Sequence, residues 1–443
     1  MRKVLALVDG EHYPPTTRWG LAAARTMGFE VIACLFVGGH EKLAGDLDLG
    51  GVPVEVVEGD MPEVLSAAIE RYRPEAILDL SDEPVLGYRE RMLLVAVALA
   101  AGVSYVGPDF SIEPSITGPP LSVPTVGVIG TGKRTGKTAI AGEAARVFAE
   151  AGFRPVVVAM GRGGPPAPQV AEAGSVDLDA LRELVARGEH AASDYLEDAV
   201  TSGVTTVGAR RCGGGLAGGP FVSNVREAAQ AAIEAGAGLV LLEGSGAALP
   251  PVPWDAGVLV CHAGISEEYL AGYLGPYRLL LSDLIVLTMA AGPEIGAQQV
   301  AALTSHVRRL RPGARIVVTD FKPLPLGDVR AKKVFLATTA PESTLPTLIA
   351  HLEQAFGCGV VAATHRLGDR EGLAADIEAA PEFETLLTEL KAAAVDVAAE
   401  RAVARGADVV FLDNRAETLE GDGELGDLLR EVGQTAIERA SAR

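Results

Sequence analysis

Short apolar runs alternate with helical patterns along the first hundred residues. The apolar runs cover residues 4–8, 31–37, 76–80 and 103–106. The stretches between them, in which apolar residues recur with a helical period, cover residues 18–27, 62–72 and 88–101. Strands that alternate with helices are typical of a parallel α/β sheet. We therefore predict an N-terminal Rossmann-like domain built on a parallel sheet.

A second α/β unit follows, and its first strand leads through a glycine-rich loop into a helix at 138–151. Its predicted strands cover residues 125–129, 155–159, 238–242, 256–260, 284–288 and 315–319. Residues 161–219 are rich in glycine and are predicted to form a long irregular stretch, which is usually functional or mobile. In the remaining chain, strands are predicted at 334–338, 359–363 and 408–412.

Five prolines between residues 108 and 124 indicate a linker. We therefore expect three parts: residues 1–120 as an N-terminal α/β domain with its linker, 121–340 as the core, and 341–443 as a C-terminal α/β extension of the core. A small third domain is the alternative for the last part.

The balance of charges limits the classes of partner. The chain has 38 basic and 58 acidic residues and a formal net charge of −20, which repels nucleic acid and anionic membranes. Its four cysteines are far apart and favour a reduced cytoplasm. We expect a cytoplasmic enzyme with no nucleic-acid or membrane partner. An anionic substrate would need local clusters of Arg and Lys.

The loop between the first core strand and its helix has the composition of a phosphate-binding loop. Glycines let backbone amides approach phosphate oxygens at the start of a helix, where the partial charge is positive. The predicted nucleotide contacts are Gly130, Thr131, Gly132, Arg134, Thr135, Gly136, Lys137 and Thr138. Lys137 is predicted to hold the β- and γ-phosphates, and the hydroxyl of Thr138 is predicted to bind Mg²⁺.

A carboxylate at the end of a neighbouring strand normally completes such a magnesium site. Glu243 follows an apolar strand and precedes a loop of small residues, so we predict that it serves the metal; the alternative is an acid that caps the strand. Lys133 is predicted to neutralise charge on the transferred phosphoryl group. A solvated loop charge is the alternative for Lys133 and for Arg134.

Two basic loops of the core are candidate sites for an acidic substrate. Arg162 follows the second core strand, at the edge where open α/β sheets bind ligands, and is also a candidate for a catalytic role. Arg210 and Arg211 precede a run of glycines whose free amides would add to an anion site. A flexible surface hairpin is the alternative for that loop.

Two further regions are predicted to contact ligands. His12 and Arg18 follow the first strand of the N-terminal domain and are candidate substrate contacts, with a solvated rim as the alternative. Phe321 and Lys322 follow the strand predicted at 315–319, where this class of core meets the nucleobase. The chain lacks the Asn-Lys-x-Asp signature of guanine binding, which favours ATP.

These motifs resemble known families. The phosphate loop and the Glu243 loop resemble those of biotin-synthesis and cobyrinate ligases, so we expect a P-loop NTPase core of the dethiobiotin-synthetase-like type. Together with the segment that opens the N-terminal domain, residues 8–14, they resemble the cyclic 2,3-diphosphoglycerate synthetase family nearly from end to end.

The resemblance implies an ATP- and Mg²⁺-dependent ligase that closes an intramolecular phosphoanhydride in 2,3-diphosphoglycerate, releasing ADP and phosphate. It also implies a homodimer. A 2-phosphoglycerate kinase would share the nucleotide and the anion site, and a nucleotide-dependent switch protein of the same P-loop lineage is the alternative from another class.

Overall fold

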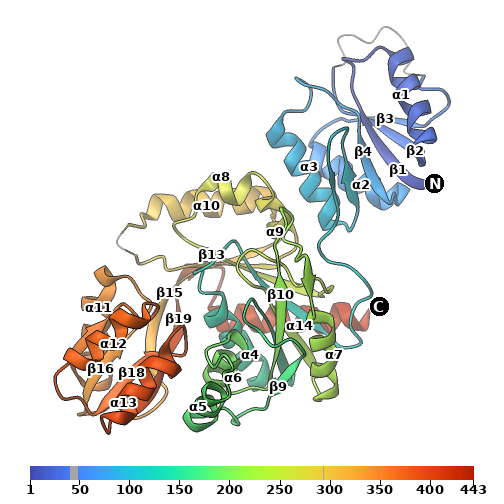
Figure 1. Cartoon of the computed structure of the whole chain (residues 1–443). Coiled ribbons are helices and arrows are strands. Elements are labelled where there is room, and N and C mark those ends of the chain that lie inside the picture. The colour runs from blue at the N-terminus through green and yellow to red at the C-terminus, as the bar shows by residue number, and fades with distance from the viewer. Residues whose placement is uncertain (40–47, 293) are drawn as a thin grey trace.

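The computed structural model describes residues 1–39, 48–292 and 294–443, and these form two sheets (Figure 1). The first sheet has six strands in the order β3-β2-β1-β4-β5-β6, parallel except for β6. Its strands are β1 Arg2–Val8, β2 Phe29–Phe36, β3 Val54–Val56, β4 Ala76–Asp79, β5 Ser104–Val106 and β6 Ser111–Ile112. Its helices are α1 Pro14–Thr26, α2 Met61–Tyr72 and α3 Tyr88–Ala100. We call this part the N-terminal lobe.

The second sheet has thirteen strands, and its path runs β11-β10-β8-β12-β7-β13-β14-β15-β19-β18-β16-β17, with β9 paired to β10. The strands of the core lobe are β7 Thr125–Gly130, β8 Pro155–Gly161, β9 Gln169–Ala171, β10 Thr206–Cys212, β11 Val222–Ser223, β12 Leu239–Glu243, β13 Ala256–His262, β14 Leu284–Thr288 and β15 Arg315–Pro325. All residues of β7, β12 and β14 are buried. Strands covered on both faces are typical of parallel sheets flanked by helices.

Helices flank the core strands. They are α4 Lys137–Glu150, α5 Leu178–Ala186, α6 Asp194–Ser202, α7 Val225–Glu234, α8 Glu267–Ala271, α9 Gly275–Leu280 and α10 Ala297–Leu310. The last helix of the chain, α14 (Leu425–Ser441), returns to the core lobe and packs on α4 and β13. Among the described residues, no helix is long and apolar enough to cross a membrane.

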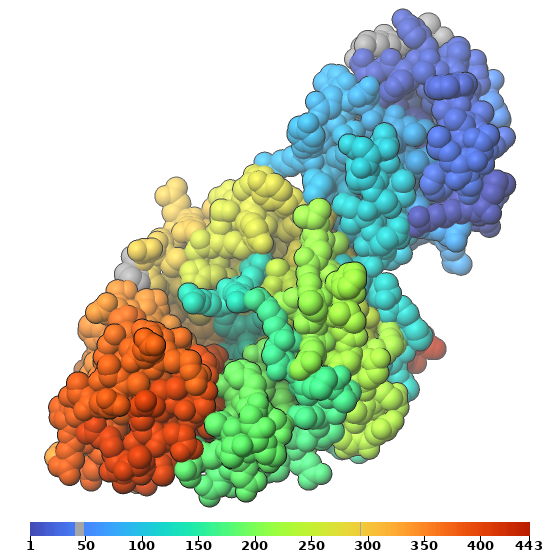
Figure 2. Space-filling model, viewed as in Figure 1, coloured from blue at the N-terminus to red at the C-terminus, as the bar shows by residue number. Residues whose placement is uncertain are grey.

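The C-terminal lobe continues the same sheet. Its elements are β16 Lys333–Ala337, α11 Leu345–Phe356, β17 Gly359–Thr364, α12 Arg370–Ala379, β18 Thr385–Glu389, a π-helix at Ala394–Ala399, α13 Glu400–Ala404 and β19 Asp408–Gly421. The long strands β15 and β19 pair antiparallel and join this lobe to the core. Figure 2 shows an elongated molecule with the N-terminal lobe at one end and the C-terminal lobe at the other.

The prediction that residues 161–219 are irregular is wrong. The structure places β9, α5, α6 and β10 in this segment. Glycines and prolines interrupt the pattern between these short elements; β10 and α6 pack on β8, β9 pairs with β10, and α5 packs on the π-helix at Ala394–Ala399. Propensity is a weak guide for helices of this length, because most of their stability comes from tertiary contacts.

The predicted end of a strand at Thr319 is also wrong. Strand β15 continues to Pro325 because β19 supplies hydrogen-bonding partners along that length. The structure also contains strands β3, β6 and β18, which the sequence pattern did not predict. The division into three parts, with boundaries after residues 120 and 340, remains a prediction.

Candidate functional site

The phosphate loop lies between β7 and α4, at the middle of the large sheet. Gly136 caps α4 with a left-handed backbone, φ 79°, and a Cβ there would lie 2.4 Å from the ring of Phe321. Only glycine meets both requirements without strain. The hydroxyl of Thr288 donates to the carbonyl of Thr135 at 2.7 Å and fixes the loop to β14. The predicted nucleotide contacts from Gly130 to Thr138 thus share one loop at a helix N-terminus.

Glu243 lies directly beside this loop. It ends β12, the strand next to β7, and its Oε1 accepts a 2.8 Å hydrogen bond from the hydroxyl of Thr138. The residue is only 2% exposed, and its Oε2 has no hydrogen-bonding partner in the described structure. Burial raises the pKa of Glu243, and the nearby Lys137 opposes that rise.

A second buried carboxylate, which no motif in the sequence marks, faces the first. Asp198, on α6, is fully buried; no N–H or O–H of the described residues donates to its carboxylate, which lies close enough to Glu243 for the two carboxyl groups to share a proton. Burial and then repulsion from Glu243 raise the pKa of Asp198. Without a cation, such a pair lowers its charge by holding a proton, and a cation bound between the two groups would favour the charged form of both.

The pair fits Mg²⁺, which typically takes one or two carboxylates together with phosphate oxygens and water. No group of three Asp, Glu, His or Cys side chains in the described ranges is arranged to hold a metal without further ligands. The donors would therefore be Thr138, Glu243, Asp198 and the phosphates of a bound nucleotide. The helical spacing of Tyr195, Ala199 and Ser202 was the sequence signal for α6.

Three basic side chains surround Gly246, in the loop that follows Glu243. A Cβ on Gly246 would lie 3.4 Å from Arg162 Nη2, 3.7 Å from Lys133 Cγ and 3.9 Å from Arg211 Nη2. No Asp or Glu in the part of the chain that the structure describes forms an ion pair with any of the three. We call Lys133, Arg162 and Arg211 the basic cluster.

Arg211 is the buried member of the basic cluster, with 9% exposure. Its guanidinium donates to the carbonyl of Ser245 at 2.9 Å and to the carbonyl of Gly213 at 2.6 Å. Burial, and then the neighbouring charge of Arg162, lower the pKa of Arg211. Unpaired cations that repel one another are arranged to accept an anion.

Arg210 does not join this cluster. Successive side chains of a strand point to opposite faces, and Arg210 is exposed where Arg211 is buried. Its Nε donates to the carbonyl of Gly164 at 2.6 Å. The structure thus separates two neighbours that the sequence analysis treated as one site.

His12 and Arg18 lie in the N-terminal lobe, and their polar contacts stay within it. His12 Nδ1 lies 2.9 Å from Oδ1 of the buried Asp9, and Arg18 donates to the carbonyl of Asp48 at 2.7 Å. Asp9 follows β1 and Asp79 ends β4, two neighbouring parallel strands. His12, Asp9 and Asp79 thus lie at the carboxyl ends of strands of the N-terminal sheet, whereas the basic cluster belongs to the core lobe.

Phe321 and Lys322 lie inside β15 and not in a loop after it. The ring of Phe321 packs against Gly136 of the phosphate loop. Lys322 forms a 2.5 Å ion pair with Glu417 on β19, and both side chains are about half exposed. Phe321 therefore borders the phosphate loop, whereas the charge of Lys322 is already paired.

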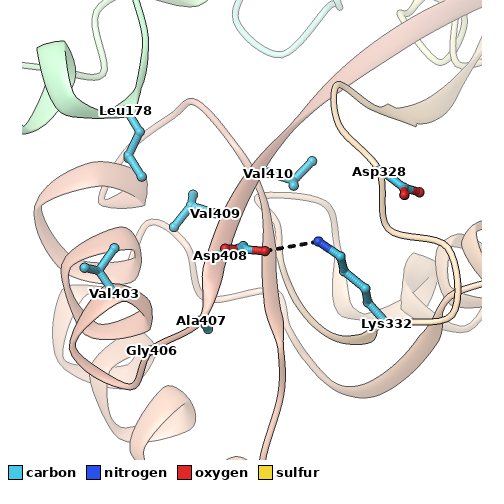
Figure 3. A pocket seen from close by; sticks show the side chains of 9 residues that line it. All are labelled: Leu178, Asp328, Lys332, Val403, Gly406, Ala407, Asp408, Val409 and Val410. Carbon is cyan, nitrogen blue, oxygen red and sulfur yellow. Dashed lines mark hydrogen bonds and ion pairs between the residues drawn. The ribbon is translucent and has the colours of Figure 1, made fainter.

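A hollow of about 580 Å³ lies away from these groups, where α13 and β19 of the C-terminal lobe meet the start of α5 (Figure 3). Its lining is mostly aliphatic, and its one marked ion pair joins Lys332 to Asp408 at 3.1 Å. No residue of the phosphate loop or of the basic cluster lines it, so we do not place the reaction there.

Family models of cyclic 2,3-diphosphoglycerate synthetase match most of the chain: the N-terminal domain at residues 3–113, the P-loop domain at 125–320 and the C-terminal domain at 325–415. The synthetase of Rubrobacter xylanophilus is 48% identical over 435 residues, 98% of each chain. That of Methanothermobacter thermautotrophicus is 39% identical over 449 residues, 98% of this chain and 96% of the relative.

Solved structures are more distant. HypB from Helicobacter pylori in complex with nickel covers 45% of this chain and 79% of its own, at 11% identity and a TM-score of 0.27. The hydrogenase maturation factor HypB from Archaeoglobus fulgidus gives 15% identity and a TM-score of 0.28 over 45% of this chain and 82% of its own. These scores are too low to support an argument. The identity and coverage of the sequence matches are decisive: the chain belongs to the cyclic 2,3-diphosphoglycerate synthetase family.

Proposed function

We propose that this protein is an ATP-dependent ligase that converts 2,3-diphosphoglycerate into cyclic 2,3-diphosphoglycerate, with release of ADP and phosphate. The observation that carries the proposal is the basic cluster at Gly246, which lies beside the phosphate loop and has no carboxylate partner in the described structure. In a chain with a net charge of −20, such a cluster suits a substrate with several negative charges. The names of the family's members support the same substrate.

The proposed reaction has two displacements. An oxygen of one substrate phosphate attacks the γ-phosphorus of ATP, the bond from that phosphorus to the β-bridging oxygen breaks, and ADP leaves. An oxygen of the second substrate phosphate then attacks the activated phosphorus of the first. The bond to the transferred phosphoryl group breaks, inorganic phosphate leaves and the ring closes. Each step is a transfer between phosphates and needs no nucleophile from the protein.

The residues of the chain then act by position and charge. The amides from Gly130 to Gly136 and the Lys137 ammonium hold the nucleotide phosphates, with Phe321 beside them. Thr138, Glu243 and Asp198 would hold Mg²⁺, which when bound supplies positive charge at the β- and γ-phosphates. The basic cluster holds the substrate phosphates. Lys133 is part of the phosphate loop as well as of the basic cluster, and it neutralises the charge of the transferred phosphoryl group.

Finer features of the proposal rest on separate observations. The strand order β3-β2-β1-β4-β5 supports a Rossmann-like N-terminal lobe. The Thr138–Glu243 contact supports the dethiobiotin-synthetase-like type of core. Four free cysteines support a cytoplasmic location, and we retain a homodimer from the family resemblance.

Phosphorus NMR of the products tests the proposed function. The protein is incubated with ATP, Mg²⁺ and 2,3-diphosphoglycerate, and Lys137→Ala serves as the matched inactive variant. We expect resonances of a cyclic phosphoanhydride, ADP and phosphate, and at least about a hundredfold lower rate for the variant. Formation of 2,3-diphosphoglycerate from 2-phosphoglycerate and ATP, without the cyclic product, would identify a kinase instead.

A further inference from the structure

Arg278 is a buried arginine that lies behind the turn carrying Gly246. It belongs to α9 and is only 8% exposed. Its Nη2 donates to the carbonyl of Ala247 at 2.6 Å, and its Nη1 donates to the carbonyl of Leu274 at 3.3 Å. Its Nε is buried and has no hydrogen-bonding partner among the described residues.

The positive charge of Arg278 is not balanced by a nearby acid. No Asp or Glu of the described ranges pairs with it, and the groups around it are Tyr269, Tyr277 and Cys261. Burial lowers the pKa of Arg278. A buried guanidinium without a carboxylate costs folding free energy, and an apolar side chain of similar volume often stabilises a protein at such a position. The retained charge therefore indicates a role other than stability.

The turn in front of Arg278 is held from two sides by arginines. Ser245 and Ala248 pair across it, so that Gly246 and Ala247 form its tip. Arg211 binds the carbonyl of Ser245, and Arg278 binds the carbonyl of Ala247. The amides of Gly246 and Ala247 have no acceptor in the part of the chain that the structure describes. We call residues 245–248 the anion turn.

The glycine segment after β10 meets the same point. The carbonyl of Gly218 accepts a hydrogen bond from the amide of Leu249 at 2.8 Å. A Cβ on Gly218 would lie 3.0 Å from both Arg278 Nη2 and the carbonyl oxygen of Ala247. Arg278 therefore lies against two segments: the anion turn, and the glycine segment that follows Arg211.

We infer that Arg278 is a positioning residue of the substrate site, which fixes the anion turn and adds an unbalanced positive charge behind it. The ligand class is a phosphate group of the acidic substrate, bound by the two free amides and by the basic cluster. Arg278 acts through the turn and does not touch the ligand. The inference rests on the proposed function, since it assigns this residue to the same site.

Two variants of the full-length protein test the inference. Arg278→Met removes the charge and the hydrogen bonds while keeping an extended apolar side chain, and Arg278→Lys keeps the charge. Calorimetry measures the affinity for 2,3-diphosphoglycerate and for a non-hydrolysable ATP analogue, and thermal unfolding measures Tm. We expect Arg278→Met to weaken 2,3-diphosphoglycerate binding by about tenfold or more, with the ATP analogue within about threefold and Tm unchanged or higher.

Arg278→Lys should recover part of the lost affinity, and in kinetics the KM for the substrate should rise more than kcat falls. Arg226→Met is the matched control, because Arg226 also donates only to backbone carbonyls, those of Thr117 and Pro119 in the segment before β7, and makes no hydrogen bond to the anion turn. The control should bind both ligands as the wild type does.

Equal losses for both ligands, or a lower Tm with unchanged 2,3-diphosphoglycerate affinity, would overturn the inference. If Arg278→Met does not fold, the lysine variant decides: a larger loss of affinity for 2,3-diphosphoglycerate than for the ATP analogue supports the positioning role, and equal changes for the two ligands contradict it. A wild type that binds 2,3-diphosphoglycerate but forms no cyclic product would overturn the proposed function and leave the inference intact.

Discussion

Buried charges without partners mark the candidate site at the scale of single residues. Arg211 and Arg278 are almost fully buried, and no carboxylate of the described residues pairs with either. Asp198 and Glu243 are buried against each other, and their carboxyl groups lie close enough to share a proton. The positive pair lies around the anion turn, and the negative pair lies beside Thr138. A cation would complete the negative pair, and an anionic ligand would complete the site at Arg211, with Arg278 behind the turn.

Arg211→Ala should weaken binding of 2,3-diphosphoglycerate selectively. A charge-assisted contact to phosphate contributes about 1.5 to 3 kcal/mol, so the loss is roughly ten- to a hundredfold in affinity. Arg210→Ala is the matched control, because its side chain lies on the other face of β10. Titration of both variants with 2,3-diphosphoglycerate and with an ATP analogue checks this. Equal effects of the two substitutions on substrate affinity would show that Arg211 does not bind the substrate.

Glu243→Gln and Asp198→Asn should each raise the Mg²⁺ concentration needed for half-maximal rate, by about tenfold or more, because each removes a charged oxygen ligand. The rate is measured against Mg²⁺ concentration for both variants. Asp179→Asn on α5 is the control, since that carboxylate is exposed and its Arg182 partner is 3.8 Å away. If the dependence of the rate on Mg²⁺ concentration were unchanged in Glu243→Gln, Glu243 would only cap its strand and would not bind the metal.

At the scale of elements, the last helix is held to the core by close packing. Helix α14 lies against α4, and Gly433 at its middle faces the aromatic rings of Phe148 and Phe153. A Cβ on Gly433 would lie 2.8 Å from Phe148 Cε1 and 2.9 Å from Phe153 Cε2. The helix thus approaches α4, whose first residue is Lys137 of the phosphate loop, through a glycine.

Gly433→Ala should lower Tm, although alanine favours a helix by roughly 0.5–1 kcal/mol, because overpacking costs about 1–3 kcal/mol. Gly426→Ala on the same helix is the control, since the nearest atom to its Cβ would be Val147 Cγ2 at 3.9 Å. That variant should keep or raise Tm. Thermal unfolding of both proteins measures the difference. A shift in the same direction for both would contradict close packing at Gly433.

At the scale of the whole molecule, both outer lobes touch the core near the site. In the N-terminal lobe, residues 94–99 of α3 are all buried, because α3 packs on its own sheet and on α9, the helix of Arg278. From the C-terminal lobe, Lys391 Nζ lies 2.9 Å from Oε1 of Glu197, the neighbour of Asp198 on α6. Burial raises the pKa of Glu197 to about 7, and Lys391 opposes that rise.

Lys391→Met should destabilise the contact between the C-terminal lobe and α6. We expect a loss of about 1–2 kcal/mol, less than for a fully buried pair because the Lys391 side chain is 36% exposed. Chemical unfolding measures it, and adding Glu197→Gln should restore part of the loss. Lys332→Met is the control, since its partner Asp408 is 71% exposed. Equal effects of the two lysine substitutions would contradict a special role for Lys391.

The sequence predicted the local parts of the site and most of the central strands. The loop from Gly130 to Thr138 and the acid Glu243 depend on short-range geometry, since a strand, a glycine turn and a helix are contiguous in the chain. Asp198 escaped prediction because a buried acid cannot be told from an exposed one in the sequence: Glu197 and Asp198 are buried together with the apolar residues of α6. Strand β15 is longer than predicted because a partner ninety residues away extends it.

The family membership inferred from the sequence is confirmed. The position of a nucleotide's phosphates at the loop from Gly130 to Thr138 stays a prediction of the sequence, and it rests on one contiguous motif. Only the tertiary structure decided which charges meet. It brings Lys133, Arg162 and Arg211 together at Gly246, turns Arg210 away, and sets Asp198 against Glu243 and Arg278 behind the anion turn. The physical reason is that the order of strands in the sheet, and the face on which each side chain emerges, depend on long-range packing that no local pattern encodes.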